Sequence, residues 1–492
     1  MLLAAVKLQL GNLSFADSSA LRQRIGEIVA THKGIFRVGS LFSGCSMEMP
    51  ALLCLESVWK NMFGRDISFQ YVFAAEKVEW RRNFVIEQCK PKQAFGDVIE
   101  LAEKDWEGKD YISGETRYLE TCDILFAGFE CDDRSLLNSK DRKTSDHGIE
   151  DNSGRTGSTA RATLDLITKR RCRAFLENLK VLGQSNVNYL TKTLNDKRMI
   201  VITLMMQANH YGSRTRRERQ WFYVAPVETH IDQLAEDYER PPWVSRFLTI
   251  VQAMRISAEP LSSFLFKEDD LRLAEWHSLE RQRRVSLESR SKPGSSQNQI
   301  LKWKTDHQIL YSEHDLQWPP VLSGDMKLAL SPWPESITER AYFLKCVHAK
   351  TSKTGERTHD LNMSLEYGSG ADESFPCIVC SSKMYMISRG RMASWWECLR
   401  LQGYPVHRLG HLLLSQNQGM ELAGNAFNGF VIPPLVVAAF ILDPDIVSTH
   451  ITPAASLPLD PVASSSEGES GEGFRLLIPD DESESEESDE TA

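Results

Sequence analysis

No apolar run in this sequence reaches the length of a membrane-spanning helix. The opening MLLAAVKLQLGNL is too short and too mixed in composition for a secretory signal peptide. No segment is repeated along the chain, which argues against a repeat protein. We therefore expect a folded protein that does not associate with membranes.

Cysteine is not arranged as a disulfide framework, because the ten residues stand at irregular spacings in a chain of 492. Cys377 and Cys380 form one CxxC pair, and no second pair follows to complete a set of four zinc ligands. We therefore predict reduced, mostly buried cysteines in an intracellular protein and no metal site. A zinc site at this pair is the alternative interpretation.

An excess of positive charge is also lacking, since 57 Lys and Arg stand against 67 Asp and Glu, a net charge of −10. The deficit comes from the C-terminal end. From Glu467 onward there are eleven acids and one base, whereas the rest of the chain balances at 56 of each. A neutral body with an acidic tail can still carry a basic binding face, so charge alone does not exclude nucleic acid.

Strand-like apolar runs alternate with helical patterns between residues 35 and 227. The strand-like runs are Ile35–Phe42, Phe69–Glu76, Cys122–Phe129 and Arg219–Val227, and the helical stretches include Pro50–Met62 and Ala160–Arg173. This alternation predicts an α/β fold with a mostly parallel sheet and helices on both faces. Ligands of such sheets bind at the carboxyl ends of the strands.

The alternation of strand-like and helical patterns is lost after residue 227. Regular apolar patterns return near residue 384, with helical patterns at Trp395–Leu401 and Val431–Leu442. The tail, with its SESEESDE run, cannot bury enough apolar surface to fold alone. We therefore divide the chain into an N-terminal extension (1–34), a catalytic domain in two parts (35–227 and 384–445), an insertion (228–383) and a disordered acidic tail (446–492).

One group of candidate residues follows the first strand-like runs. Phe42, Ser43 and Gly44 open a small-residue turn in which a cofactor could approach the backbone, although the turn is not a GxGxxG sequence. Glu76 ends the next strand, where its carboxylate could accept hydrogen bonds from ribose hydroxyls. Asp97 follows a third short apolar run.

A second group carries nucleophilic and charged side chains. Cys131 follows the apolar run that ends at Phe129, and Glu177 lies near the end of another strand-like run. Arg217 precedes a further apolar strand and Arg219 begins it, at a position where guanidinium groups can hold carboxylates or phosphates. Each residue alone has an ordinary structural explanation, as a core cysteine or a solvated charge.

Six motifs in this order resemble those of the cytosine-C5 DNA methyltransferase family. They are FSGCS (42–46), GFEC (128–131), LENL (176–179), TRRER (215–219), RLQGYP (400–405) and GNAF (424–427). The resemblance implies a Rossmann-like S-adenosylmethionine methyltransferase sheet with a smaller inserted target-recognition domain, at residues 228–383. It also implies that residues 35–227 and 384–442 form one seven-stranded mixed sheet flanked by helices, with Asn425 beside Gly44.

The same resemblance implies the chemistry. Cys131 would add to C6 of a flipped cytosine, Glu177 would bind N3 and the exocyclic amine, and Arg217 and Arg219 would position them. S-adenosyl-L-methionine would be held by residues that include Phe42, Ser43, Gly44, Glu76, Asp97 and Asn425. DNA is the implied partner, RNA the alternative substrate, and the nucleus the expected location.

Several positions depart from the family pattern. Glu130 stands in place of the proline before the nucleophile and Asp132 in place of a glutamine, and carboxylates beside a thiol disfavour the thiolate. Thr215 replaces the glutamine of the arginine motif, and Ser46 replaces a glycine. A non-catalytic nucleic-acid-binding protein with the same fold is therefore the alternative to an active enzyme.

Overall fold

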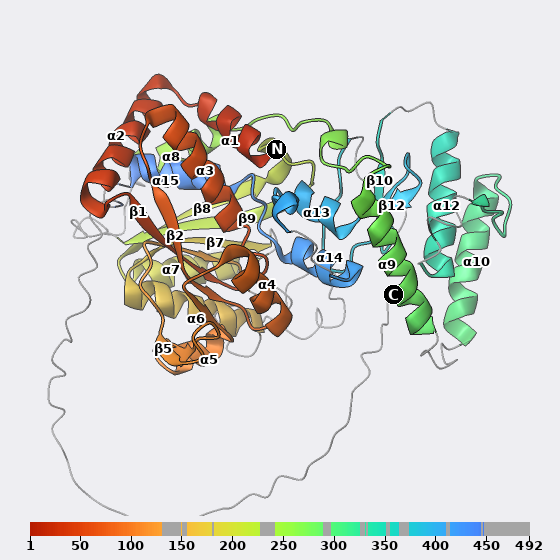
Figure 1. Cartoon of the computed structure of the whole chain (residues 1–492), viewed down its shortest axis with the longest axis horizontal. Helices are drawn as coiled ribbons and strands as arrows, with labels where there is room; N and C mark the ends of the chain where they lie inside the picture. Colours follow the sequence, from red (N-terminus) through yellow and green to blue (C-terminus); the bar gives the residue numbers. More distant parts are fainter. Residues whose placement is uncertain are drawn as a thin grey trace, which may run out of the picture. The chain divides into compact units, whose positions relative to one another are not determined.

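The structure is a computed structural model of the chain (Figure 1). The residues that it describes are 1–129, 149, 155–179, 182–226, 242–288, 297–324, 330, 333–350, 355–363, 373–409, 414–443 and 446. The predicted nucleophile Cys131, its neighbours Glu130 and Asp132, and residues 447–492 of the predicted acidic tail lie outside the described residues.

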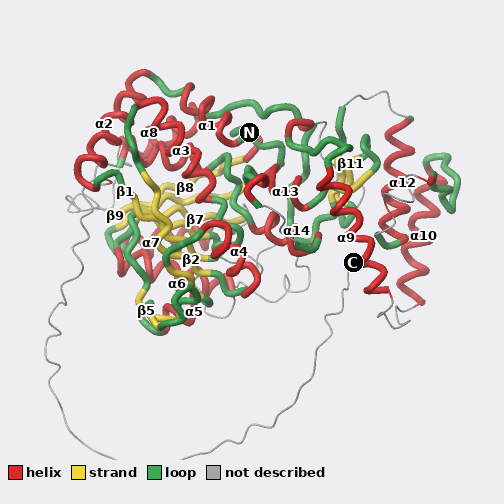
Figure 2. Tube along the Cα trace, in the orientation of Figure 1, coloured by secondary structure: helices red, strands yellow, loops and turns green. Residues whose placement is uncertain are grey.

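A seven-stranded sheet has the strand order β3-β2-β1-β6-β7-β9-β8. Figure 2 shows its strands in yellow, surrounded by helices. Its strands are β1 (Ile35–Leu41), β2 (Ser68–Ala75), β3 (Gln93–Phe95), β6 (Ile124–Ala127), β7 (Arg173–Leu179), β8 (Met199–Gln207) and β9 (Glu218–Pro226). Strand β9 pairs antiparallel with both β7 and β8, and the other pairings are parallel. The predicted fold class, α/β with a mostly parallel Rossmann-like sheet, is confirmed.

Alternate side chains of the central strands enter two separate apolar clusters, as the two-residue period of a strand requires. Phe126 and Phe175 stack at 5.3 Å between ring centroids in one cluster, whereas Leu125 and Leu176 belong to the other. Both faces of the sheet are therefore buried, which explains why these strands read as continuous apolar runs rather than as alternating ones.

Helices cover both faces (Figure 1). The helices whose buried side chains join the cluster of Phe126 include α1 (Leu2–Gly11), α2 (Phe15–His32), α3 (Glu48–Phe63), α4 (Glu79–Cys89), α8 (Pro242–Ala253) and α15 (Ile432–Leu442). Those that join the cluster of Leu125 are α5 (Val98–Glu103), α6 (Arg155–Arg170) and α7 (Gln184–Asn195). The helix expected over Ala160–Arg173 ends at Arg170, because Arg173 already begins β7.

The segment 1–34, expected as an extension, contributes two helices to the core. The Nε2 of Gln9 donates hydrogen bonds to the carbonyl oxygens of Tyr211 and Phe430, both at 2.9 Å. One buried side chain of α1 therefore joins the two parts of the chain that flank the insertion.

The insertion contains helices that the sequence patterns did not indicate. They are α9 (Leu271–Glu288), α10 (Gln297–Glu313) and α12 (Glu335–Ala349). A three-stranded sheet joins β10 (Thr358–Asp360), β11 (Met384–Met386) and β12 (Arg391–Met392), and so crosses the expected boundary at residue 383. Helix α8, inside the expected insertion, packs on α15 (Figure 1). The domain boundaries remain predictions.

The returning segment supplies helices rather than strands of the central sheet. Helix α13 (Trp395–Leu401) has the predicted bounds and begins with a capping box made by Ser394 and Glu397, and α14 (Gln416–Asn425) and α15 follow. The remaining short elements are β4 (Glu107–Lys109), β5 (Thr116–Tyr118) and the 3₁₀ helices Ala208–His210, Leu261–Ser263 and Val406–Arg408. Among the helices described, none combines the length and apolar character that crossing a membrane requires.

A glycine near the end of α14 permits a close backbone contact. A Cβ added at Gly424 would lie 2.3 Å from the backbone nitrogen of Cys380 and 2.5 Å from the carbonyl carbon of Val379. Both are main-chain atoms, so the clash could be relieved only by moving the segment around residues 379–380.

We therefore predict that Gly424→Ala lowers the free energy of unfolding by about 1–3 kcal/mol, the usual cost of overpacking. The matched control is Gly26→Ala in α2, where an added Cβ would meet nothing within 4 Å. This control should be neutral or stabilising by up to about 1 kcal/mol, because alanine favours helix. Urea unfolding of both variants measures the difference, and equal effects would contradict the close contact.

Candidate active site

The loop after β1 is held in an unusual backbone conformation. Phe42, Gly44 and Ser46 have φ of 55°, 52° and 51°, in the left-handed region that non-glycine residues rarely adopt. The loop is tied to the end of β2, because the backbone N–H of Ser43 donates to Ala75 (3.2 Å). These contacts position the predicted cofactor loop at the carboxyl ends of two parallel strands.

Glu76 lies directly after β2 and is 6% exposed. Its Oε2 accepts a hydrogen bond from the backbone N–H of Gly44 (3.0 Å), and its Oε1 accepts one from that of Val78 (3.0 Å). Each carboxylate oxygen can accept a further hydrogen bond, so both oxygens keep capacity for hydroxyl donors. The carboxylate is therefore fixed beside the loop.

Asp97 has a structural function at its position. Its Oδ1 accepts a hydrogen bond from the backbone N–H of Ile99 (2.9 Å) and so caps α5, and its Oδ2 pairs with Lys77 Nζ at 2.9 Å. The predicted contact of Asp97 with the cofactor is untested by this geometry.

The end of α14 packs against the loop. The carbonyl oxygen and Cβ of Asn425 lie 3.7 and 4.0 Å from the position that a Cβ on Gly44 would occupy. The expected packing of Asn425 beside Gly44, from segments 381 positions apart in sequence, is thereby confirmed.

An arginine joins the two sides of this region. Arg81, in α4, forms an ion pair with Glu421 in α14 and lies 3.7 Å from Oε1 of Glu76. The sequence motifs gave no indication of Arg81, because its partners come from segments far apart in the chain.

Glu177, Arg217 and Arg219 gather on the other side of the α14 end. Strands β7 and β9 are antiparallel neighbours, which brings Arg219 Nε to 3.1 Å and Arg217 Nη2 to 3.6 Å from Oε1 of Glu177. Arg217 is 4% exposed, and burial, with a smaller contribution from Arg219, lowers the pKa of its guanidinium. Two cations face one carboxylate, so the cluster carries an excess of positive charge.

The segment that leads to the predicted nucleophile begins beside this cluster. A Cβ on Gly128 would lie 3.8 Å from Oε2 of Glu177, and Asn178 Nδ2 donates to the carbonyl of Phe129 (3.2 Å). The ring of Phe427, from the GNAF motif, occupies the space that a side chain at Gly128 would need. The structure thus describes the approach to Cys131, although Cys131 itself lies outside the described residues.

Two successive residues of α14 connect both groups. The carbonyl of Gly424 accepts a hydrogen bond from Arg217 Nη1 (2.9 Å), and the next residue, Asn425, packs beside Gly44. The predicted cofactor loop and the predicted base-binding cluster therefore meet at one helix end.

The CxxC pair lies at the same place. The carbonyl of Ile378 accepts from Arg217 Nη1 (3.3 Å), and Cys380 Sγ donates to Asn425 Oδ1 (3.0 Å). The CxxC spacing marked Cys377 and Cys380 as a pair in the sequence. The spacing did not indicate that this segment contacts Arg217 and Asn425. Within the described residues, no group of three or more His, Cys, Asp or Glu side chains could hold a metal ion.

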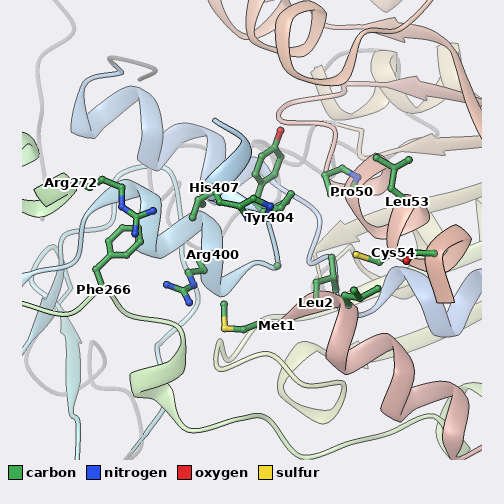
Figure 3. Close-up of a pocket in the computed structure, with 15 residues that line it drawn as sticks. Met1, Leu2, Pro50, Leu53, Cys54, Phe266, Arg272, Arg400, Tyr404 and His407 are labelled. Carbon is green, nitrogen blue, oxygen red and sulfur yellow. The ribbon is translucent and has the colours of Figure 1, made fainter. Parts of the chain in front are cut away.

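A cavity of about 440 Å³ lies elsewhere (Figure 3). Its walls include the start of α1, side chains of α3, and residues of the RLQGYP motif such as Arg400 and Tyr404. Arg272 stacks 4.0 Å above the ring of Phe266 on another wall. None of the predicted catalytic or cofactor-binding residues in the described part of the chain lines this cavity.

Comparisons with known proteins found one curated sequence relative and several solved structures that align with the chain. No protein-family model matches the chain. The DNA (cytosine-5-)-methyltransferase DMT5 of Cryptococcus neoformans var. grubii serotype A is 23% identical over 432 residues, which is 82% of this chain. The chain spans only 17% of the length of that relative.

Solved structures of low sequence identity also align with the chain. The S. pombe Dnmt2 methyltransferase is 12% identical, with 83% of this chain and 99% of that chain covered and a TM-score of 0.43. A putative DNA modification methyltransferase from an E. coli prophage is 14% identical, with the same coverage and TM-score. Likeness at this level does not bear on function, so the fold class rests on the sheet itself.

The fold and the site together define an α/β protein whose polar groups gather at the carboxyl ends of its parallel strands. The similarity to a curated DNA cytosine-5-methyltransferase confirms the family resemblance that the six motifs indicated.

Glu48 is a buried acid next to the predicted cofactor loop. It lies in the first turn of α3, is 0% exposed, and its Oε1 accepts a hydrogen bond from the Tyr71 hydroxyl (3.3 Å). Burial raises the pKa of Glu48 to about 7. A raised pKa means that the folded protein binds a proton more tightly than the unfolded chain does.

We therefore predict that Glu48 destabilises the fold progressively as the pH rises from its unfolded pKa near 4.5 to about 7. Relative to wild type, Glu48→Gln should gain about 3 kcal/mol between pH 4.5 and pH 8, since each pKa unit corresponds to about 1.4 kcal/mol. Thermal unfolding at both pH values measures this gain. The exposed Glu115→Gln is the control, and a pH-independent difference for Glu48→Gln would refute the prediction.

Proposed function

We propose that this chain is a DNA cytosine-C5 methyltransferase that uses S-adenosyl-L-methionine and a covalent Cys131 adduct. The observation that carries the proposal is the end of α14, where Gly424 contacts Arg217 and Asn425 contacts the Gly44 loop. A methyl donor and a target base must lie next to each other, and this helix end lies between the groups that would hold them.

The residues on the cofactor side fit S-adenosyl-L-methionine. Glu76 is buried, fixed by two backbone N–H groups and still able to accept from ribose hydroxyls. Gly44 has a φ of 52°, which glycine adopts without strain, and it packs beside Asn425. When bound, the cofactor supplies the electrophilic methyl group. The predicted contributions of Phe42, Ser43 and Asp97 remain part of the proposal.

The chain's own residues would carry the base chemistry. The thiolate of Cys131 would add to C6 of cytosine, which makes C5 nucleophilic. Glu177 would accept hydrogen bonds from the exocyclic amine and from N3 once N3 is protonated in the adduct. Arg219, at 3.1 Å, and Arg217 hold the carboxylate of Glu177 in one orientation. Such preorganised charge stabilises a developing transition state without reorganisation at the moment of reaction.

DNA is the proposed substrate because the sequence relative is named as a DNA (cytosine-5-)-methyltransferase. The target cytosine would leave the base stack to reach the site, as it cannot be attacked within a duplex. We assign target recognition to residues 228–383 and a nuclear location to the protein. Two alternatives remain for experiment to separate. The substrate could be RNA, or the protein could bind nucleic acid without catalysis, because Glu130 and Asp132 depart from the family pattern beside Cys131.

We expect wild-type protein to transfer labelled methyl groups from S-adenosyl-L-methionine to DNA, and Cys131→Ala to lose this activity by several orders of magnitude, as removal of a nucleophile does. Cys54→Ala, at a half-buried thiol in α3, is the control for non-specific cysteine effects. DNA with 5-fluorocytosine should trap wild-type protein covalently, because release of Cys131 requires a base to remove a proton from C5, and C5 carries fluorine in place of that hydrogen.

The same assay separates the alternatives. Transfer to tRNA but not to DNA would change the substrate, and no transfer to either with intact DNA binding would favour the non-catalytic protein. Full activity of Cys131→Ser over several turnovers would exclude Cys131 as the nucleophile.

We also expect Glu76→Ala to weaken binding of S-adenosyl-L-methionine by ten- to a hundred-fold, about 1.5–3 kcal/mol for hydrogen bonds to a charged group. Isothermal titration calorimetry measures the affinity. The control is Glu115→Ala, because Glu115 is exposed and pairs with Arg117 away from the loop. Unchanged affinity for Glu76→Ala would show that another residue binds the ribose.

A further inference from the structure

The CxxC pair lies between the two halves of the proposed site, and the proposed chemistry makes no use of it. Cys377 is half-buried, Cys380 is exposed, and both are thiols in this structure. The segment between them presses its backbone onto Gly424, within 2.3–2.5 Å of an added Cβ. Any change in this segment would therefore act directly on the end of α14.

The two sulfur atoms contact different halves of the site. Arg219 Nη2 donates to Cys377 Sγ at 3.7 Å, and the same guanidinium pairs with Glu177 through its Nε. Cys380 Sγ donates to Asn425 Oδ1 at 3.0 Å. One thiol thus contacts the proposed base-binding cluster and the other the proposed cofactor-binding residue.

Two guanidinium groups and one accessible thiol meet at this pair. Arg219 contacts Cys377 Sγ, and Arg217 contacts the carbonyl of Ile378 between the two cysteines. Cys380 is also accessible to a small reagent, because its side chain is exposed. The other thiols in the described residues are buried or half-buried.

We propose that Cys377 and Cys380 form a reversible disulfide that switches the site off. The oxidant is a small-molecule disulfide such as oxidised glutathione. The Cys380 sulfur attacks one sulfur of this disulfide and displaces the first small thiol, which leaves with the Cys380 proton. The Cys377 sulfur then attacks Cys380 Sγ and displaces the second, which leaves with the Cys377 proton. Two protein thiols are oxidised and one small disulfide is reduced to two thiols.

The disulfide removes one of the present contacts. The Cys380 thiol donates its S–H hydrogen to Asn425 Oδ1, whereas a sulfur atom in a disulfide has no hydrogen to donate. Closing the S–S bond of about 2.05 Å therefore abolishes this hydrogen bond, and it constrains the backbone between the two cysteines, which touches Gly424. Because Gly424 and Asn425 connect both halves of the site, oxidation would separate the proposed cofactor and base positions.

The activity readout of this inference rests on the proposed function, but disulfide formation does not. The full chain is equilibrated in buffers of reduced and oxidised glutathione, and the remaining thiols are alkylated. Mass spectrometry should find the Cys377–Cys380 disulfide at ratios where the half-buried Cys54 and Cys346 are still alkylated. Alkylation of Cys377 and Cys380 to the same extent as these two, or a disulfide from either to another cysteine such as Cys131, would overturn the proposal.

The second readout is the ratio of activity in reduced to oxidised buffer, which cancels any effect of a substitution on basal activity. It should be at least about tenfold for wild type, the effect of losing one positioned hydrogen bond. It should be near one for Cys377→Ser and Cys380→Ser, and as in wild type for Cys346→Ser. Hydrogen exchange at residues 416–427 should rise on oxidation in wild type alone.

These readouts distinguish the two proposals. A disulfide with increased exchange but no methyl transfer in either buffer would refute the proposed function and leave the redox site in place. A disulfide with unchanged exchange and a ratio near one would refute the switch.

Discussion

The backbone contact between Gly424 and residues 379–380 is the constraint on which the site depends. It places the Gly424 carbonyl where Arg217 can donate to it, and it leaves Asn425 against the Gly44 loop. Arg217 is buried and loses its hydration, so its stability depends on Glu177 and on the carbonyls of Ile378 and Gly424. The helix end and the arginine therefore hold each other in position.

Charge is distributed unequally across this helix end. On the Glu177 side, two arginines surround one carboxylate, which leaves one positive charge in excess. On the Glu76 side, Arg81 lies between Glu76 and Glu421, which leaves one negative charge in excess. The proposed cofactor carries a positive sulfonium and the proposed nucleic acid is an anion, so each half has the sign that suits its proposed ligand.

The sequence predicted those features that depend on local patterns. The sequence predicted the strands β1, β2, β6 and β9 from their apolar runs. It also predicted, from the order of the motifs, that Asn425 lies beside Gly44. Both features depend on patterns that are local in the sequence. The apolar run of β8 went unassigned, although its β-branched residues indicate a strand. The sequence did not predict the contacts of Arg81 with Glu421 and of Cys380 with Asn425. These contacts join segments that are far apart in the sequence, and only the complete fold brings them together.

The position of α15 has a consequence for how the chain folds during synthesis. Its apolar residues complete the cover of the sheet, where Phe440 packs on Phe36, Phe69 and Trp59 at 5.0–6.2 Å. The last strand of the sheet ends at Pro226 and α15 begins at Ile432. At roughly 5–20 residues per second, a ribosome needs on the order of 10–40 s to make the segment between them. During that interval an aromatic face stays uncovered, so the nascent chain is a natural client for chaperones that bind exposed apolar surface.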